Sequence, residues 1–289
     1  MKKHNSIQHL LSLLAAFSIA FTSGCFVTKD FGVEESCFFG TSENDVNTCR
    51  IPLEIAAGGE HSCIIRADRT VACWGSNEFG QLGVEKDGFR VDAVHYPLQV
   101  PTLGNTSQIS AGHRHTCAID KNEETNNKRI YCWGDNRRGQ TGRTPGDDSQ
   151  KIITLPKIVT TTQAKSWSQV SAGGHHTCAL SAEDGAYKGG EVFCWGDNSL
   201  GQVDGEKSES YFSSPQKKNL SDFPIVGLSS GLNHTCAHNG ENIFCWGNPS
   251  SGKTGHQLIE SGTYKDANKR AQVGQEWDPG TKIIDISAG

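Results

Sequence analysis

The sequence is poor in hydrophobic residues, which make up 35% of its 289 residues, against roughly 45–50% in a typical soluble domain. It has a single Met, and the two shortages together disfavour a bundle of helices. The formal net charge is −5, so the chain lacks the basic excess that binding to nucleic-acid phosphates requires. We therefore expect no nucleic-acid partner.

Signatures of catalysis are also missing. The sequence contains no phosphate-binding P-loop, no dinucleotide-binding fingerprint and no pair of catalytic carboxylates at a recognisable spacing. Asp135-Asn136 and Asp197-Asn198 are not followed by a calcium-binding loop, and we expect them to form turns. The chain is accordingly expected to be neither an enzyme nor a binder of a small-molecule cofactor or metal ion.

Glycine and cysteine, in contrast, are abundant. The 33 Gly residues suit many short strands joined by turns, because Gly adopts the positive φ angles that tight turns need. Eleven Cys residues are too many for a typical protein of the reducing cytosol. The glycine content thus predicts a protein of many short strands, and the cysteine content predicts an exported protein that carries disulfides.

The first 24 residues have the features of an export signal. A short cationic start, Met1 to Lys3, precedes a 12-residue apolar run over residues 10–21, which is too short to span a bilayer as a helix. Thr22-Ser23-Gly24-Cys25 resembles a bacterial lipobox, although Thr22 stands where Leu is usual. We expect Cys25 to carry a lipid that anchors the chain to the bilayer. The alternative is ordinary cleavage that leaves Cys25 as a spare thiol.

The anchor predicts a location in the bacterial cell envelope. Phe26, rather than Asp, follows Cys25, which by resemblance to enteric sorting rules implies an outer-membrane lipoprotein or a cell-surface protein. Residues 25–50 would then form a linker stapled by a Cys37–Cys49 disulfide.

A paired motif occurs four times after this linker. Its first half reads AAGGEHSC, SAGHRHTC, SAGGHHTC and SSGLNHTC, and its second half begins ACWGSN, YCWGDN, FCWGDN and FCWGNP. The repeated histidines and tryptophans are His61, His115, His176, His234, Trp74, Trp133, Trp195 and Trp246. Internal repetition of one motif along a chain is typical of solenoids and propellers.

These motifs resemble the repeats of the regulator of chromosome condensation family, in the cysteine-bearing form of exported bacterial proteins. The resemblance implies an all-β fold, a β-propeller of four-stranded antiparallel blades, over residues 51–289. The expected units are about 51–107, 108–168, 169–226 and 227–285, and 285–289 would open a fifth. Four complete repeats are fewer than the family's usual closed ring. We interpret this as an incomplete ring from a truncated reading frame; the alternative is that the last strand pairs elsewhere.

Each unit is expected to carry one disulfide across a hairpin. A polar stretch with turn residues lies between the two cysteines of each unit, and opposed residues of an antiparallel pair lie within reach of a disulfide. The expected pairs are Cys63–Cys73, Cys117–Cys132, Cys178–Cys194 and Cys236–Cys245.

The repeated histidines allow two interpretations. A zinc site would need convergent ligands and free thiolates, which disulfides do not supply. We therefore expect each imidazole to form a structural hydrogen bond within its own blade. Similarly, Gly227-Leu228-Ser229-Ser230-Gly231 fits the pattern of a nucleophile elbow, but it aligns with a strand of the repeat and we expect it to be structural.

Binding is expected in the loops, whose lengths vary while the motifs do not. The candidate residues are Lys121, Glu123, Glu124, Tyr187, Arg137 and Arg138. The sequence thus predicts a non-enzymatic scaffold, a membrane-anchored propeller lipoprotein that presents variable loops to a protein or glycan partner. The alternatives are guanine-nucleotide exchange on a small GTPase, by family resemblance, and a propeller-type enzyme inhibitor.

Overall fold

The computed structural model describes one unit of the chain, which lies within Pro52–Gly289. The described residues are 52–86, 88–162, 164, 166–184, 189–220, 224–255 and 282–289. The predicted signal peptide, Cys25, the Cys37–Cys49 pair and Tyr187 lie outside them. Among the described residues, no helix has the length and apolar character needed to cross a membrane.

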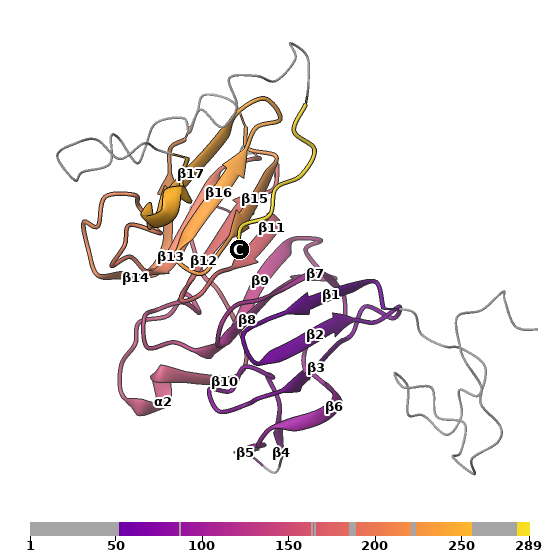
Figure 1. Ribbon diagram of the computed structural model, residues 1–289. Coiled ribbons are helices and arrows are strands. Elements are labelled where there is room, and N and C mark those ends of the chain that lie inside the picture. Colours follow the sequence, from indigo (N-terminus) through magenta and orange to yellow (C-terminus); the bar gives the residue numbers. More distant parts are fainter. Residues whose placement is uncertain are drawn as a thin grey trace, which may run out of the picture. The chain divides into compact units, whose positions relative to one another are not determined.

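Antiparallel sheets follow one another along the chain, and we call them blades 1 to 4 (Figure 1). Blade 1 contains β1 (Glu54–Ala57), β2 (His61–Ile65), β3 (Val71–Gly75) and β6 (Val94–Gln99). Blade 2 contains β7 (Thr106–Ala111), β8 (His115–Lys121), β9 (Lys128–Asp135) and β10 (Ile152–Ile158). Blade 3 contains β11 (Trp167–Ala172), β12 (His176–Ser181), β13 (Val192–Asp197) and β14 (Tyr211–Lys218). Blade 4 contains β15 (Gly227–Ser230), β16 (His234–His238) and β17 (Ile243–Gly247).

Three of these sheets have four strands, which confirms the predicted all-β blade architecture. The first strands of blades 2 and 3 begin two residues ahead of the unit boundaries predicted at 108 and 169. In blade 4 the stretch 256–281 lies outside the described residues. Minor elements are β4 (Glu85–Lys86), β5 (Phe89–Arg90), the short helix α2 (Asp148–Lys151) and the 3-10 turn η1 (Ser250–Gly252).

The fourth strands lie at the edge of their sheets. Pro97, Pro156 and Pro215 fall in β6, β10 and β14, each of which pairs with one neighbour only. An edge position tolerates proline because one side of such a strand needs no N–H donor.

Alternating side chains in each blade pack against two different neighbours. In blade 2, Cys117, Ile119 and Cys132 join an apolar cluster with blade 3, whereas Ala118 and Trp133 join one with blade 1. Successive residues of a strand point to opposite faces, so a blade between two others needs apolar residues at both sets of positions. The core is therefore a series of junctions between blades.

The structure pairs the same cysteines that the sequence predicted for the four units. Cys63–Cys73, Cys117–Cys132, Cys178–Cys194 and Cys236–Cys245 are disulfides, each between opposed residues of the second and third strands. Their Cα atoms lie 4.1–4.2 Å apart. Each bridge therefore locks one hairpin and does not connect one blade to the next.

The last described residues lie beside blade 4 (Figure 1). The N–H of Ala288 donates to Ser229 Oγ at 2.9 Å, just as the N–H of Ser230 donates to Ser171 Oγ at 2.9 Å between blades 3 and 4. Residues 285–289 thus contact β15 as β15 contacts β11.

Candidate binding surfaces

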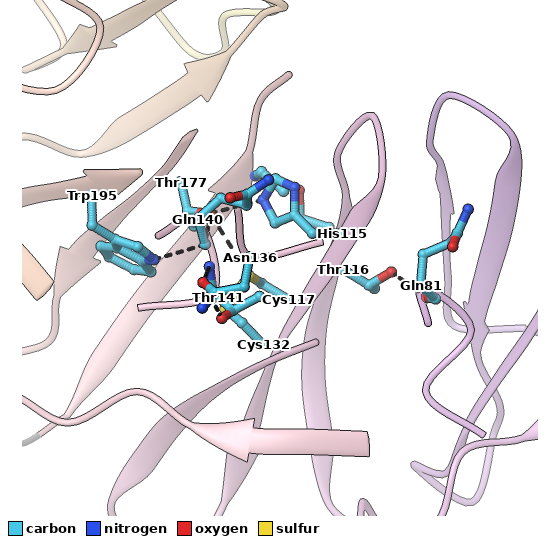
Figure 2. Close-up of a disulfide and its surroundings, with 12 residues drawn as sticks. Gln81, His115, Thr116, Cys117, Cys132, Asn136, Gln140, Thr141, Thr177 and Trp195 are labelled. Carbon is cyan, nitrogen blue, oxygen red and sulfur yellow. Dashed lines mark hydrogen bonds between the residues drawn. A yellow bond between two sulfur atoms is a disulfide. The ribbon is translucent and has the colours of Figure 1, made fainter. Parts of the chain in front are cut away.

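A repeated hydrogen-bond network joins each blade to the next, and Figure 2 shows it between blades 2 and 3. His115 Nε2 lies 2.9 Å from the Thr177 hydroxyl, and that hydroxyl donates to the main-chain oxygen of Gln140 at 2.9 Å. The indole N–H of Trp195 donates to the same oxygen at 3.0 Å. Because the hydroxyl donates its proton to Gln140, it accepts from His115, whose Nε2 therefore carries hydrogen.

The neighbouring junctions repeat this pattern. Between blades 1 and 2, His61 contacts Thr116 at 2.7 Å, and Thr116 and Trp133 both donate to the Gln81 oxygen. Between blades 3 and 4, His176 contacts Thr235 at 2.7 Å and Trp246 donates to the Gln202 oxygen at 2.9 Å. The prediction that each imidazole bonds within its own blade is wrong: these three bond to the next blade, because they lie at blade junctions.

Burial keeps these imidazoles neutral. It lowers the pKa of His61 to about 4, with the nearby His113 adding to the effect, and it lowers the pKa values of His115 and His176 to about 3. A glycine lies against each ring: a Cβ on Gly112 would be 2.5 Å from His115 Cε1. Their role in the junction is structural, and the described residues hold no group of three His, Cys, Asp or Glu side chains that could bind a metal ion.

The two remaining sequence motifs also have structural roles. The carboxylates of Asp135 and Asp197 accept from the N–H groups of Arg137 and Ser199, two residues on, which is the predicted turn geometry. Ser229 lies within strand β15 and its hydroxyl accepts from Ala288, so it does not sit at a strand-to-helix elbow.

The predicted binding residues lie at two opposite ends of blade 2. One end, here called the loop end, is where β7 turns into β8 and where β9 leaves toward β10; Arg137 and Arg138 follow β9 there. The other, the hairpin end, is where β8 and β9 are joined; Lys121 pairs with Lys128 at that end, and Glu123 and Glu124 lie in the turn. These residues therefore form two surfaces rather than one site.

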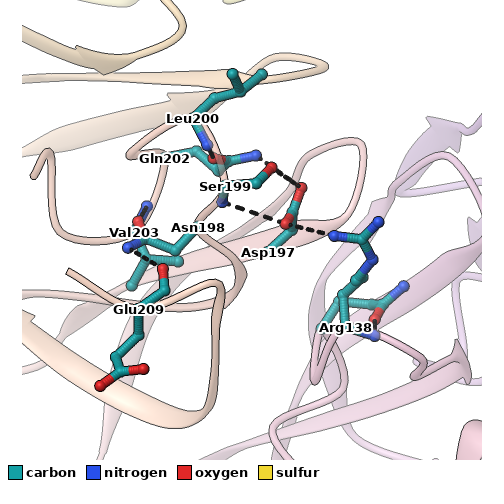
Figure 3. Close-up of polar contacts among 9 residues, drawn as sticks. Arg138, Asp197, Asn198, Ser199, Leu200, Gln202, Val203 and Glu209 are labelled. Atoms are coloured by element: carbon teal, nitrogen blue, oxygen red, sulfur yellow. Dashed lines mark hydrogen bonds and ion pairs between the residues drawn. The ribbon is translucent and has the colours of Figure 1, made fainter. Parts of the chain in front are cut away.

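At the loop end, the arginines are engaged with carboxylates. Arg137 Nη2 lies 2.8 Å from Asp135, and Arg138 Nη1 lies 3.0 Å from Asp197 of blade 3 (Figure 3). Burial raises the pKa of Asp135, but hydrogen bonds from Arg137 and its positive charge outweigh this and hold that pKa below its ordinary value. The side chains of Arg137 and Arg138 remain 46% and 52% exposed, so both keep donors for a partner.

Sequence reasoning missed two members of this surface. The guanidinium carbons of Arg114 and Arg137 lie 4.3 and 4.6 Å from the ring centroid of Phe79, which comes from blade 1. Phe79 and Arg114 both occupy variable positions inside the repeated motifs. Phe79 stands where the next unit has Arg138, and Arg114 stands where the preceding unit has Glu60. Comparison of these variable positions between units is the signal that points to them.

The chain is similar in sequence to several known proteins. The chain is 30% identical over 204 residues to the ultraviolet-B receptor UVR8 of Arabidopsis thaliana, covering 70% of this chain and 42% of the receptor. It is 31% identical over 241 residues to the probable E3 ubiquitin-protein ligase HERC6 of Homo sapiens, covering 82% of this chain and 21% of HERC6. The chain spans less than half the length of these relatives.

Among solved structures, the chain resembles one in the crystal structure of Kap60 bound to yeast RCC1 (Prp20). The TM-score is 0.62 at 21% identity, covering 78% of this chain and 49% of the other, a likeness that supports the fold. Two family models, both described as Regulator of chromosome condensation (RCC1) repeat, match residues 70–119 and 128–180, and 54–81, 107–140 and 167–202. Together these matches extend over residues 54–202, more than half of the chain, which therefore belongs to the regulator of chromosome condensation repeat family.

Proposed function

We propose that this protein is a non-enzymatic binding scaffold of the bacterial cell envelope, held to a membrane by a lipid on Cys25, that presents the variable ends of its blades to a protein or glycan partner. The observation that carries the proposal is that repeated residues and variable residues occupy different places in each unit. The repeated side chains, such as His115 and Trp195, are buried and bond to neighbouring blades. Residues that differ between units, among them Arg137 and Glu123, lie at the two ends of the strands.

The disulfides support the proposed export. Four bridges among the described residues would be reduced in a typical cytosol, whereas they persist in the oxidising compartments outside it. A binding role is in keeping with the family, since its propellers serve as frameworks and functional differences between proteins of one fold lie in the sites they carry.

The anchor is tested by metabolic labelling with a palmitate analogue in a bacterial host. We expect the full chain to be labelled and to sediment with membranes, and the Cys25→Ser variant to be unlabelled and released. Unlabelled wild-type protein would overturn the anchor while leaving the binding role to be tested separately.

The partner is sought by capture from envelope extracts with purified protein, using two variants that alter opposite ends of blade 2. One replaces the turn 122–127 by Asn-Gly, and the other is Arg137→Gln/Arg138→Gln. We expect one variant to lose the captured partner and the other to retain it, with both showing intact disulfides. Equal capture by both, and by a blank resin, would contradict a scaffold that works through these ends. Stimulated nucleotide release from a small GTPase would support exchange activity instead.

A further inference from the structure

We infer that a hollow at the hairpin end of blades 2 to 4 binds a neutral hexose unit of a glycan. The hollow has a volume of about 310 Å³, at the small end of the roughly 300–1,000 Å³ that ligand pockets occupy. Its lining includes Gln108, Gln169, Leu180, Gly227, His238 and Asp285. The inference rests on the proposed binding role and names one ligand class for it.

A coupled change in the repeat lies at this hollow. In blades 1 to 3 the first strand places a Glu or Gln opposite an aliphatic residue of the second strand: Glu54 opposite Ile65, Gln108 opposite Ile119 and Gln169 opposite Leu180. In blade 4 the same cross-strand pair is Gly227 and His238. Both residues of this pair differ from those of blades 1 to 3. At the other paired positions of these two strands, at least one residue of blade 4 keeps the character that it has in the other blades.

The carboxylate or amide at this position has a structural task in blades 1 to 3. The side chains of Glu54, Gln108 and Gln169 each accept the main-chain N–H of the next blade, from Ile109, Val170 and Leu228 respectively. Gly227 has no side chain to do so, and the N–H of Ile286 donates to Asp285 Oδ1 instead. Blade 4 therefore gives up a junction hydrogen bond where the hollow opens, a loss that a ligand-binding role would explain.

His238 brings a directed donor into the hollow. Its side chain is buried, with the residue only 3% exposed, and its Nδ1 accepts from the N–H of Gly240 at 3.3 Å. Nε2 therefore carries the hydrogen, and it has no hydrogen-bond partner among the described residues. A Cβ on residue 227 would lie 2.3 Å from Nε2, so Gly227 is required to admit the ring.

The mixture of groups favours a hexose over an anion. The imidazole N–H donates, the Asp285 carboxylate accepts, and Val226 adds an exposed apolar side chain beside these polar groups. Sugar hydroxyls both donate and accept, while the C–H face of the ring packs on apolar surface. Burial lowers the pKa of His238, with Asp285 acting in the opposite direction, so a neutral imidazole offers no charge to an anion.

The test uses the repeat itself as the control. Gly227→Gln/His238→Ile restores the pair found in blade 2 and should fold, because it fills the hollow with side chains that the other blades accommodate. The probes are glucose, galactose and N-acetylglucosamine. Binding of each sugar to the full chain is measured by saturation-transfer NMR. We expect transfer to at least one sugar with the wild type and at least a tenfold loss with the double variant, at an unchanged or higher Tm.

Two outcomes would overturn the inference: no transfer to any of the three sugars from the wild type, or equal transfer from the double variant. The single variant Gly227→Gln separates folding from binding, since its new side chain meets the His238 ring and should lower the Tm until His238→Ile relieves the contact. Capture of a partner that depends on the turn 122–127 or on Arg137 and Arg138 would persist in every one of these variants, which distinguishes a failed sugar site from a failed scaffold.

Discussion

Lowering the pH from 7 to 5 should destabilise the folded protein through the histidines at the blade junctions. Their pKa values, about 4 for His61 and about 3 for His115 and His176, lie below the ordinary value because the rings are buried. Protonation would add a hydrogen to Nδ1, which has no acceptor in any of the three. The unfolded chain therefore takes up protons first, so stability is complete above the ordinary pKa and falls as the pH drops toward the folded values.

The magnitude follows from the unfolded state. At pH 5 an unfolded histidine with a pKa near 6.5 is about 1.5 pH units into its protonated range, while the buried one is still neutral, which costs about 2 kcal/mol per ring. Three rings together would lose about 6 kcal/mol, comparable with the whole stability of many domains, about 5–15 kcal/mol. Asp135 contributes little in this interval, because its pKa lies below the ordinary carboxyl range.

The assay is urea unfolding at pH 7, 6 and 5 with the disulfides intact, followed by fluorescence of the junction tryptophans. A His115→Gln variant keeps a side-chain N–H donor near Thr177 but does not titrate, so its loss of stability between pH 7 and 5 should be smaller by about 2 kcal/mol. Equal free energies of unfolding at pH 7 and 5 would refute the claim that these imidazoles are buried and neutral. The same pH dependence in the variant would refute the assignment to His115.

Three further predictions concern the junctions and bridges. Gly112→Ala should lower the free energy of unfolding by about 3 kcal/mol, since its Cβ would lie 2.4 Å from the Gly173 oxygen, whereas Gly104→Ala, with open space around it, should be neutral or stabilising by about 0.5 kcal/mol. Thermal unfolding measures both, and equal effects would contradict the packing. Trp195→Phe should cost about 2 kcal/mol by leaving the Gln140 oxygen with one donor fewer, while Trp74→Phe, at a half-buried position, should cost less; denaturant midpoints decide between them. Reduction of the bridges, which close 9 to 16 residues, should cost about 3 kcal/mol each, and a Tm insensitive to reductant would argue against them.

The candidate surfaces were only partly predictable from the sequence. The sequence predicts Arg137 and Arg138 as binding residues, but the pairing of Arg138 with Asp197 of the next blade depends on a contact between units. Phe79 was not recognised because its partner Arg114 lies in another blade. The pair Gly227 and His238 could be found by comparing the units, since both residues depart from the repeat. The sequence analysis interprets Gly227 only as part of a structural strand and does not compare it with its cross-strand partner.

Local features of this protein were readable from the order of its residues, and contacts between units were not. The hairpins, their disulfides and the two apolar faces of each strand depend on residues 9 to 16 apart and on the alternation of side chains, which are properties of one short segment. The partner of His115 lies 62 residues away, and that of His61 lies 55 residues away. Such pairs form only when successive sheets stack at a particular angle and offset, so the tertiary arrangement alone decided that the histidines join neighbouring blades and that the candidate binding residues face opposite ends.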